Sequence, residues 1–284
     1  MPDPDRLLHT LRQATRACRE TPGRRGRVID LRDASDAFVA GDLHGNLANF
    51  RRILERANLA GSPRRHLILQ ELIHGAFFYS AGGEKSHQLV DLVAALKCQY
   101  PHRVHVLLGN HELSQWTNRR IGKNDQDLNA LYRQGVDSAY GSRSAEVYAA
   151  YLEFFAALPL VLRTANRVAI SHSLPSSRRL PEFDVARLEA EVNDEKDLIP
   201  GGSIHALVWG RDTAPTTAAE FLKRLSADLL IIGHIACEGG YQVPNDRQII
   251  LDSLGSPAGF CLFPVDRPLT HQELVSCIGI LRGG

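Results

Sequence analysis

Residues 38–46, with the sequence FVAGDLHGN, decide the fold of this chain. The apolar start, Phe38 to Ala40, predicts a short strand that runs into a polar cluster containing Asp42 and His44. Glycines beside this cluster permit a tight turn and close backbone approach to a bound ion or phosphate. Apolar residues at helical spacing follow and predict a helix, namely Leu47, Phe50, Ile53 and Leu54. A strand, a polar loop and a helix in this order predict an α/β fold.

Four further predicted strands end in the same way. Each is a short apolar run followed by polar side chains: 66–69 before Glu71, 104–108 before Asn110 and His111, 168–170 before His172, and 229–232 before His234. Five separate strand ends therefore deliver side chains that can bind a metal ion. Because loops at the ends of a rigid sheet are where α/β folds gather catalytic groups, we expect these side chains to converge on one site.

The chemistry of this set favours two divalent cations. Carboxylate, imidazole and amide oxygen suit Mn²⁺, Fe²⁺ and Zn²⁺. One carboxylate can bridge two ions roughly 3.5–4 Å apart, and so can a hydroxide. Such a pair lowers the pKa of the bridging water and clamps phosphate oxygens, as in-line displacement at phosphorus requires. We expect Mn²⁺ as the bound cation, with Fe or Zn as alternatives.

Bulk properties exclude several other classes of function. The net charge of +1 on 284 residues gives no global attraction to nucleic acid or to an anionic membrane. No apolar run approaches the roughly 20 residues of a membrane span, and the N-terminus lacks the apolar core of a signal peptide. The five cysteines are scattered and form no CxxC pair, which argues against a disulfide framework. We therefore expect a cytoplasmic protein without nucleic-acid or membrane partners.

The chain divides into an N-terminal helical extension, residues 1–35, and one larger domain, residues 36–284. A helix is predicted over 5–20 and is stopped by Thr-Pro-Gly at 21–23. Residues 176–202 are interpreted as an insert, whose short helix over 184–193 carries Val185, Leu188 and Val192. This helix either packs on the domain or forms a lid over the substrate. The last quarter is interpreted as β-hairpins, with strands over 247–251 and 259–263.

Two of the motifs carry a family resemblance. GDLHGN at 41–46 and GNHE at 109–112 resemble the signatures of the calcineurin-like metallophosphoesterases, and most closely those of the phosphoprotein phosphatase branch. The resemblance covers roughly residues 36–265. It implies a central β-sandwich flanked by helices, the metallophosphoesterase fold, with metals at the strand ends. It also implies hydrolysis of a phosphate ester.

The resemblance assigns roles to individual positions. Asp42 and His44 match ligands of the first metal, and Asn110, His172 and His234 match ligands of the second. His111 matches the general acid that protonates the leaving oxygen. Trp209-Gly210-Arg211-Asp212 is similar to a family segment in which the arginine holds the substrate phosphate, a task that suits its fork geometry. A surface ion pair with Asp212 is the alternative role for Arg211.

The second family motif, usually Gly-Asp-x-x-Asp-Arg-Gly, departs from the pattern and is here Gln70-Glu71-Leu72-Ile73-His74-Gly75. Glu71 falls where the bridging aspartate stands, keeps its charge and adds one methylene. We expect it to bridge the metals, the alternative being an exposed strand-end carboxylate. The motif arginine is missing, and its place could be taken by Arg119, Arg120 or Lys123, unless these form a solvated face.

His74 falls where an aspartate of the family pairs with the catalytic histidine. That aspartate would raise the pKa of His111 and fix its tautomer. With His74 in its place, we expect His111 to be a more acidic acid and the pH optimum to move downward. The alternative is that His74 is an ordinary polar loop residue.

Three functions remain open at this point. The first is a phosphatase acting on a phosphomonoester, such as phosphoserine or phosphothreonine in a protein. The second is hydrolysis of a nucleotide phosphoanhydride such as a dinucleoside polyphosphate. The third, suggested by the altered 70–75 motif, is a relative that binds metal or a phosphorylated ligand without turnover. Retention of His111, which ligates nothing in this scheme, favours an active enzyme.

Overall fold

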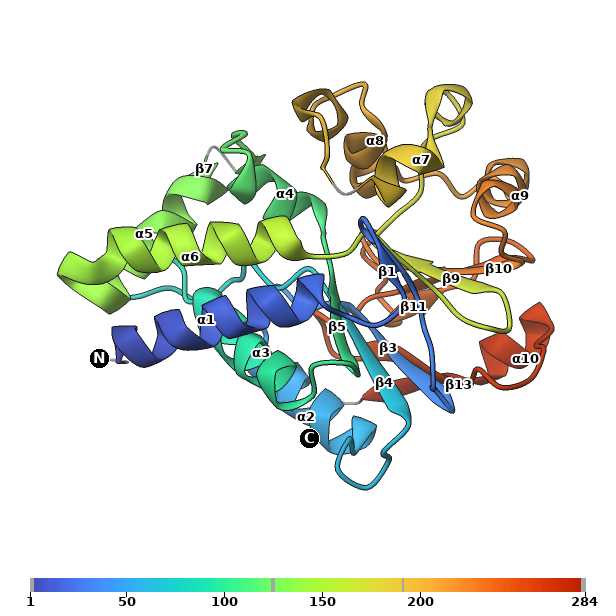
Figure 1. Cartoon of the computed structure of the whole chain (residues 1–284), viewed down its shortest axis with the longest axis horizontal. Helices are drawn as coiled ribbons and strands as arrows, with labels where there is room; N and C mark the ends of the chain where they lie inside the picture. The colour runs from blue at the N-terminus through green and yellow to red at the C-terminus, as the bar shows by residue number, and fades with distance from the viewer. Residues whose placement is uncertain (1–2, 124–125, 191, 282–284) are drawn as a thin grey trace.

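The computed structural model of the chain describes residues 3–123, 126–190 and 192–281. Within these residues, two large β-sheets share a hydrophobic core (Figure 1). The larger has the order β1-β2-β8-β9-β10-β12-β11. Its strands are β1 (Arg24–Arg25), β2 (Val28–Asp30), β8 (Val161–Arg163), β9 (Val168–Ser171), β10 (Leu229–Ile232), β11 (Tyr241–Gln242) and β12 (Gln248–Leu251).

The second sheet contains the strand that opens the fold. Its order is β14-β13-β3-β4-β5, with β3 (Asp36–Asp42), β4 (Arg65–Gln70), β5 (Val104–Leu107), β13 (Ala258–Pro264) and β14 (Ile278–Leu281). A separate small pair is formed by β6 (Gly122–Lys123) and β7 (Gln126–Asp127). Strands β3, β4 and β5 run parallel, as do β9, β10 and β12. Parallel strands are covered on both faces, which explains their continuous apolar runs.

The two sheets pack against each other through one buried cluster. The larger sheet contributes Ile170 and Ile231, and the second sheet contributes Val39, Ile68 and Leu107. All of these side chains are fully buried. The expected β-sandwich flanked by helices is therefore confirmed. Because both sheets are anchored in the same core, the ends of their strands are held in fixed relative positions.

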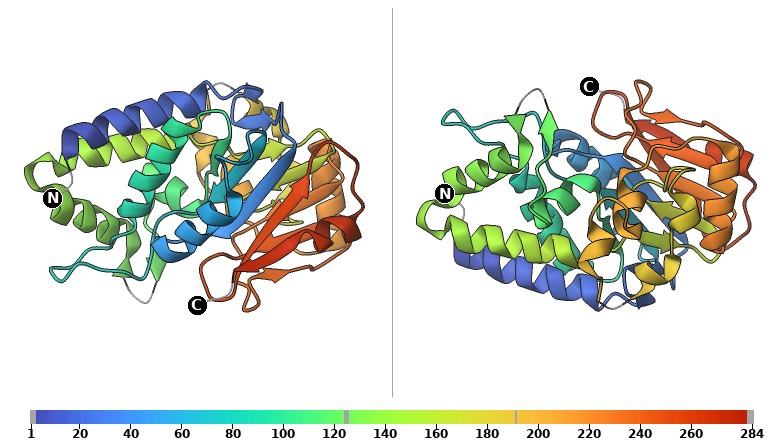
Figure 2. Two further views of the ribbon diagram at one scale, coloured as in Figure 1. Left: turned by 90° about the horizontal axis from the view of Figure 1, so that it is seen from below. Right: turned by 90° about the horizontal axis from the view of Figure 1, so that it is seen from above.

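Helices cover the outer faces of the sandwich (Figures 1 and 2). They are α1 (Pro4–Arg19), α2 (Leu47–Ala57), α3 (His87–Gln99), α4 (Asn110–Trp116), α5 (Leu128–Tyr140), α6 (Ser144–Ala157), α7 (Val185–Glu189), α8 (Ser203–Trp209), α9 (Pro215–Arg224) and α10 (His271–Ser276). Helix α1 lies along α6 and α3, and buries Leu7, Leu8 and Leu11. The predicted domain boundary after residue 35 stays a prediction.

Two local predictions hold only in part. Both strands predicted in the last quarter are present, and β12 forms a hairpin with β11, but β12 also lies parallel to β10, while β13 pairs with β3 and β14 in the other sheet. The helix of the insert is shorter than 184–193: the backbone of Ala190 is extended and ends α7. Leu188 is buried as expected, whereas the side chain of Val192 is 85% exposed.

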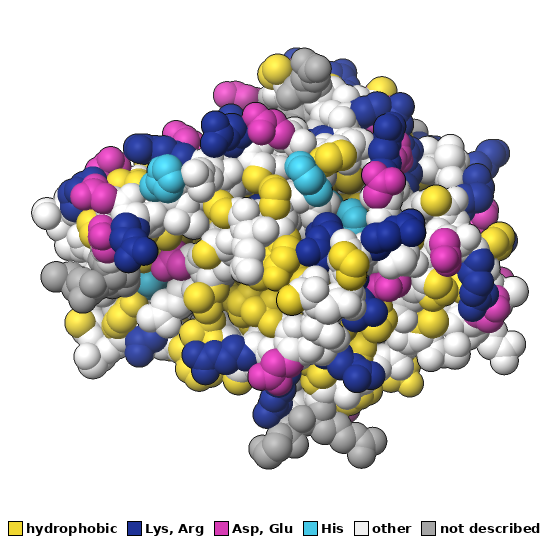
Figure 3. All heavy atoms as spheres, turned by 60° about the horizontal axis from the view of Figure 1, so that its bottom comes forward, with side chains coloured by type: hydrophobic (Ala, Val, Ile, Leu, Met, Phe, Trp, Pro, Cys, Tyr) yellow, Lys and Arg dark blue, Asp and Glu magenta, His cyan; other side chains and the backbone are white. Residues whose placement is uncertain are grey.

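Acidic and basic side chains alternate over the face shown in Figure 3, in keeping with the net charge of +1. Among the described helices, none is both long and apolar enough to span a membrane.

Candidate metal centre

The carboxyl ends of strands from both sheets meet at the candidate site. Asp42 ends β3, Glu71 follows β4 and Asn110 begins α4 just after β5. His172 and His234 follow β9 and β10 in the other sheet. Several of these loop residues have a left-handed backbone, with φ of 43° at His44, 47° at Glu71 and 66° at His234. Such strain costs of order 1 kcal/mol per residue and persists where the surrounding structure enforces it, often at functional sites.

His172 lies at the centre of a tight group of polar atoms. Its Nε2 is 2.8 Å from Glu71 Oε2, 3.1 Å from Asn110 Oδ1 and 3.1 Å from His234 Nδ1. Its Nδ1 is 3.7 Å from Asp42 Oδ1. The structure therefore brings five predicted ligands, from five strand ends, to one place.

Two sets of three side chains each have the spacing of a metal site. Glu71, His172 and His234 form one set, and Asp42, His44 and Glu71 form the other. Within each set the ligand atoms all lie within 4.8 Å of one another. Glu71 belongs to both sets and is 1% exposed, which excludes the alternative of an exposed strand-end carboxylate.

Unpartnered atoms show that these residues fit divalent cations. Asp42 Oδ1 and His234 Nε2 are buried and have no hydrogen-bond partner among the described residues. Buried polar atoms are normally paired, so such atoms point to a group that binds there. Burial lowers the pKa of His234 to about 2, which keeps its imidazole neutral, as metal binding requires. Nitrogen and oxygen donors together suit Mn²⁺, Fe²⁺ or Zn²⁺.

The pKa values of two side chains in the centre are strongly shifted from their ordinary values. Burial raises the pKa of Asp42 to about 6. Burial also opposes the charged form of His172, yet Glu71 and Asp42 raise the pKa of its imidazole to about 9. The two carboxylates thus favour the protonated form of His172, which lies 2.8 Å from Glu71. Because a ligating imidazole must be neutral, a cation binding here displaces that proton.

Sequence reasoning missed two supporting side chains. The family resemblance gives Gln70 no role, but its Oε1 lies 3.3 Å from His172 Nδ1 and its amide donates to Ala40 O at 3.0 Å. Glu112 was quoted in a motif without a role, yet its Oε1 accepts from the backbone N–H groups of Leu72 and Ile73, at 2.8 and 3.2 Å. The sequence signal that could have pointed to Glu112 was its position directly after His111.

One glycine beside the centre is required by space. A Cβ on Gly233 would lie 2.3 Å from Asp42 Oδ1. Such a contact is far shorter than van der Waals distance, so any larger residue at this position would displace a predicted metal ligand.

His111 and His74 lie together beside the centre. The backbone N–H of His111 donates to Glu71 Oε1 at 3.0 Å. Its ring centroid is 5.1 Å from that of His44 and 4.9 Å from that of His74. Burial lowers the pKa of His111 to about 3. The side chain of His74 is fully buried although the residue lies in a loop, and its pairing with His111 stays a prediction.

The predicted phosphate-binding arginine lies at the exposed edge of the site. Arg211 is exposed and makes no hydrogen bond or ion pair with the described residues, but its charge contributes to lowering the pKa of His234. The alternative ion pair with Asp212 does not form, because that carboxylate accepts from the backbone N–H groups of Ser177 and Ala214, at 2.7 and 2.9 Å.

The three residues that could replace the missing motif arginine differ in their contacts. Arg120 contacts Asp127 at 3.5 Å and is 74% exposed, and the side chain of Lys123 lies outside the described part of the structure. Burial, with the charge of Arg119, lowers the pKa of His205 to about 4. The ring of His205 stacks on Trp209, which lies 6.5 Å from His234. Of the three, Arg119 is the one whose charge acts on a residue packed against Trp209, the neighbour of His234.

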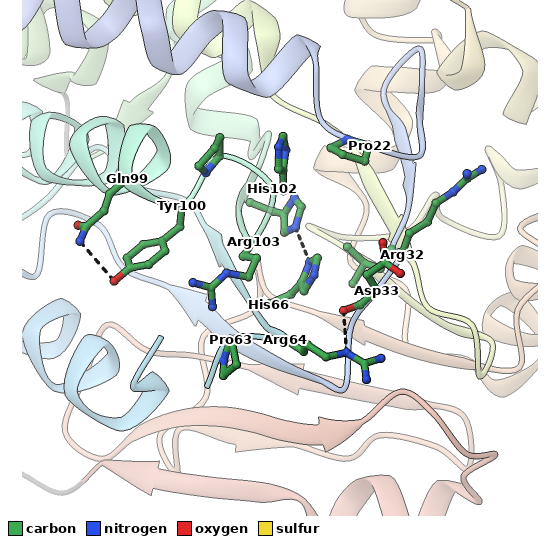
Figure 4. Close-up of a pocket in the computed structure, with 13 residues that line it drawn as sticks. Pro22, Arg32, Asp33, Pro63, Arg64, His66, Gln99, Tyr100, His102 and Arg103 are labelled. Atoms are coloured by element: carbon green, nitrogen blue, oxygen red, sulfur yellow. Dashed lines mark hydrogen bonds between the residues drawn. The ribbon is translucent and has the colours of Figure 1, made fainter. Parts of the chain in front are cut away.

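A separate cavity of about 390 Å³ lies at the other end of β4 and β5 (Figure 4). Its lining includes His66 and His105, which contact each other at 3.0 Å, as well as Tyr100 and Arg103. None of the predicted ligands lines it.

The fold and the clustered ligands together define a metal-dependent phosphoesterase architecture. The family of calcineurin-like phosphoesterases matches residues 37–238. The chain belongs to this family.

Individual relatives are phosphatases by name. A probable serine/threonine-protein phosphatase of Encephalitozoon cuniculi is 27% identical over 78% of this chain and 47% of its own length. A serine/threonine-protein phosphatase of Caenorhabditis elegans is 24% identical over 75% of this chain and 45% of its own length. The chain thus spans about half the length of these curated relatives.

Solved structures share the fold. A protein serine/threonine phosphatase from Saccharomyces cerevisiae, similar to human phosphatase PP5, superposes with a TM-score of 0.74 at 16% identity, covering 100% of this chain and 91% of its own. A cold-active protein-tyrosine phosphatase of a Shewanella species gives 0.62 at 14% identity, covering 94% and 84%.

Proposed function

We propose that this chain is a phosphatase that uses two divalent cations to hydrolyse phosphoserine or phosphothreonine in proteins. Mn²⁺ is the cation we expect, and we place the enzyme in the cytoplasm, where its cysteines, all free thiols, would stay reduced. The proposal rests on one observation above the others: Glu71 belongs to both metal-competent sets of side chains.

Each side chain has a defined task in this proposal. Asp42, His44 and Glu71 would hold one cation, while Glu71, Asn110, His172 and His234 would hold the other. When bound, the cation pair supplies Lewis-acid stabilisation of the phosphate and activates the attacking water. Gln70 contacts Nδ1 of His172, the ring nitrogen that does not face Glu71, and would thereby orient the ring. Such supporting contacts tune metal affinity.

The remaining steps belong to the chain's own residues. Arg211 and Arg119 would bind the phosphate oxygens, and their planar guanidinium groups suit that geometry. His111 would donate its proton to the leaving oxygen as the P–O bond breaks. The methylene that distinguishes Glu71 from aspartate is accommodated by a left-handed backbone, φ 47°, with its carbonyl accepting from Leu43 and His44 at 3.0 and 2.9 Å.

A phosphatase assay with added Mn²⁺ tests the proposal, with His111→Asn as the inactive control. We expect release of phosphate from a phosphoserine or phosphothreonine peptide by the wild-type chain only. Turnover of a dinucleoside polyphosphate but not of the peptides would contradict the proposed substrate. No turnover above the control on any substrate would favour a protein that binds without catalysis.

A further inference from the structure

The loop that carries His74 returns to cover it. After His74 the chain runs outward, turns at Tyr79–Gly83 and comes back through Glu84 and Ser86. Backbone bonds close this hairpin, from Lys85 N to Phe77 O at 2.8 Å and from Tyr79 N to Gly83 O at 2.9 Å. Phe77 on its outer side is 59% exposed, whereas Glu84 is only 1% exposed. The sequence contained no signal that Glu84 would turn inward.

Glu84 is bound tightly to His74. One carboxylate oxygen, Oε1, lies 3.0 Å from His74 Nδ1 and 3.3 Å from the backbone N of His74. The hydroxyl of Ser86 donates to the same oxygen at 2.8 Å. Because an ionised carboxylate can only accept hydrogen bonds, Nδ1 of His74 must carry a proton. In the neutral ring the other nitrogen, Nε2, then has a free lone pair.

That lone pair lies beside the proposed general acid. His74 Nε2 and His111 Nδ1 are both buried, and neither has a partner among the described residues. The two rings are neighbours, with centroids 4.9 Å apart and planes inclined by 58°. Each of these neighbouring rings therefore has one buried nitrogen without a hydrogen bond, and the two nitrogens are not bonded to each other in this structure.

We propose that Glu84 is a positioning residue for His111 and acts through His74. Glu84 fixes the tautomer of His74 and so keeps its Nε2 as the acceptor for Nδ1–H of His111 in the reacting complex, where Nε2–H of His111 is then the proton for the leaving oxygen. During the reaction only the Nε2 proton of His111 moves, to the oxygen released as the P–O bond breaks. Glu84 stays ionised and His74 stays neutral. This inference rests on the proposed role of His111.

Aryl phosphates with good and poor leaving groups test it in the Mn²⁺-loaded protein. General acid catalysis matters most when the leaving group is a poor one. We therefore expect Glu84→Gln to lower kcat about 10- to 100-fold on phenyl phosphate, and clearly less on p-nitrophenyl phosphate. In the His74→Asp background a carboxylate meets His111 directly. Adding Glu84→Gln there should leave kcat on phenyl phosphate unchanged or raise it, because the second substitution removes a negative charge beside the new aspartate.

Tyr132→Phe is the matched control, since the ring of Tyr132 also packs on His74, at 6.2 Å, and its buried hydroxyl has no partner among the described residues. It should leave the dependence on leaving group unchanged. Three results would overturn the proposal. Glu84→Gln could lower kcat equally on both esters, it could lower kcat equally in the wild-type and His74→Asp backgrounds, or only Tyr132→Phe could change the dependence on the leaving group.

A spectroscopic measurement tests this proposal independently of the proposed function. ¹⁵N NMR of the histidine rings in the metal-free full chain reports the tautomer of His74, whose signals are identified by their loss in His74→Asp. We expect a neutral ring protonated at Nδ1, and a changed Nδ1 shift in Glu84→Gln. An Nε2-protonated ring would overturn the proposal whether or not the protein turns over a phosphate ester. Inactivity of the wild type on both aryl esters would instead count against the proposed function alone.

Discussion

The carboxylate of Glu71 lies 2.8 Å from Nε2 of His172, although the two residues follow strands of different sheets. The contact exists because both sheets are anchored in a common apolar core. Glu71 also belongs to the set formed with Asp42 and His44, so this one carboxylate joins the two sets of metal-competent side chains into one centre.

Removing the proposed general acid should slow hydrolysis of the phosphate ester without loss of bound metal. His111 contributes only its backbone N–H to Glu71, so His111→Asn should lower kcat about 10²- to 10⁴-fold. Metal content, measured by elemental analysis, should not change. His9→Asn, on the exposed side of α1, is the control and should behave as wild type. A loss of metal in His111→Asn would show that His111 is a ligand instead.

The support of His172 by Gln70 should be visible in metal affinity. Gln70 is fully buried and contacts the nitrogen of His172 that faces away from Glu71. We expect Gln70→Ala to weaken Mn²⁺ binding about 10- to 100-fold, measured by titration calorimetry. Gln99→Ala, at the end of α3, serves as the control. Unchanged affinity in Gln70→Ala would leave that contact without a function.

The pH–rate profile should respond to residue 74. Burial, with a contribution from the neighbouring His74, lowers the pKa of His111 to about 3 although Glu71 opposes it. A general acid works while protonated, so activity falls as the pH rises through its pKa. A carboxylate at position 74 favours the charged imidazole, so the descending limb should move about one unit upward in His74→Asp.

The same profile is best repeated in His74→Asp combined with Glu84→Gln. The double variant avoids placing the new carboxylate against Glu84, which lies 3.0 Å from the ring of His74. A descending limb that stays in place in both variants contradicts the prediction that His111 is the titrating acid.

Binding of the substrate phosphate should depend on the arginines at the edge of the site. The side chain of Arg211 makes no hydrogen bond or ion pair with the described residues, and a charged hydrogen bond is worth roughly 1.5–3 kcal/mol. Arg211→Ala and Arg119→Ala should therefore each raise KM about 10- to 100-fold in steady-state kinetics. Arg120→Ala, which removes an exposed ion pair with Asp127, should have little effect. If Arg120→Ala raises KM as much as Arg119→Ala, the assignment of Arg119 is wrong.

The strand ends could be predicted because their signals are local. A buried apolar run followed by Asp42, or by Asn110 and His111, is read from a few neighbouring residues. The β-sandwich followed from the family resemblance of these motifs, and the structure confirms it.

The parts that could not be predicted depend on contacts distant in sequence. Gln70 acts on His172 across two sheets, and Glu84 reaches His74 only because the intervening hairpin folds back. Strand β12 was expected in a hairpin, which it forms with β11, but its parallel pairing with β10 was not predicted. Local periodicity carries no information about such partners, since tertiary packing decides them.

Anomalous X-ray diffraction from crystals soaked in Mn²⁺ tests the central claim most directly. The account predicts two peaks roughly 3.5–4 Å apart, one beside Asp42 and His44 and one beside Asn110, His172 and His234, with the Glu71 carboxylate contacting both. In Glu71→Gln at least one peak should be lost. A single peak in the wild type, or two peaks with Glu71 contacting neither, would contradict the account.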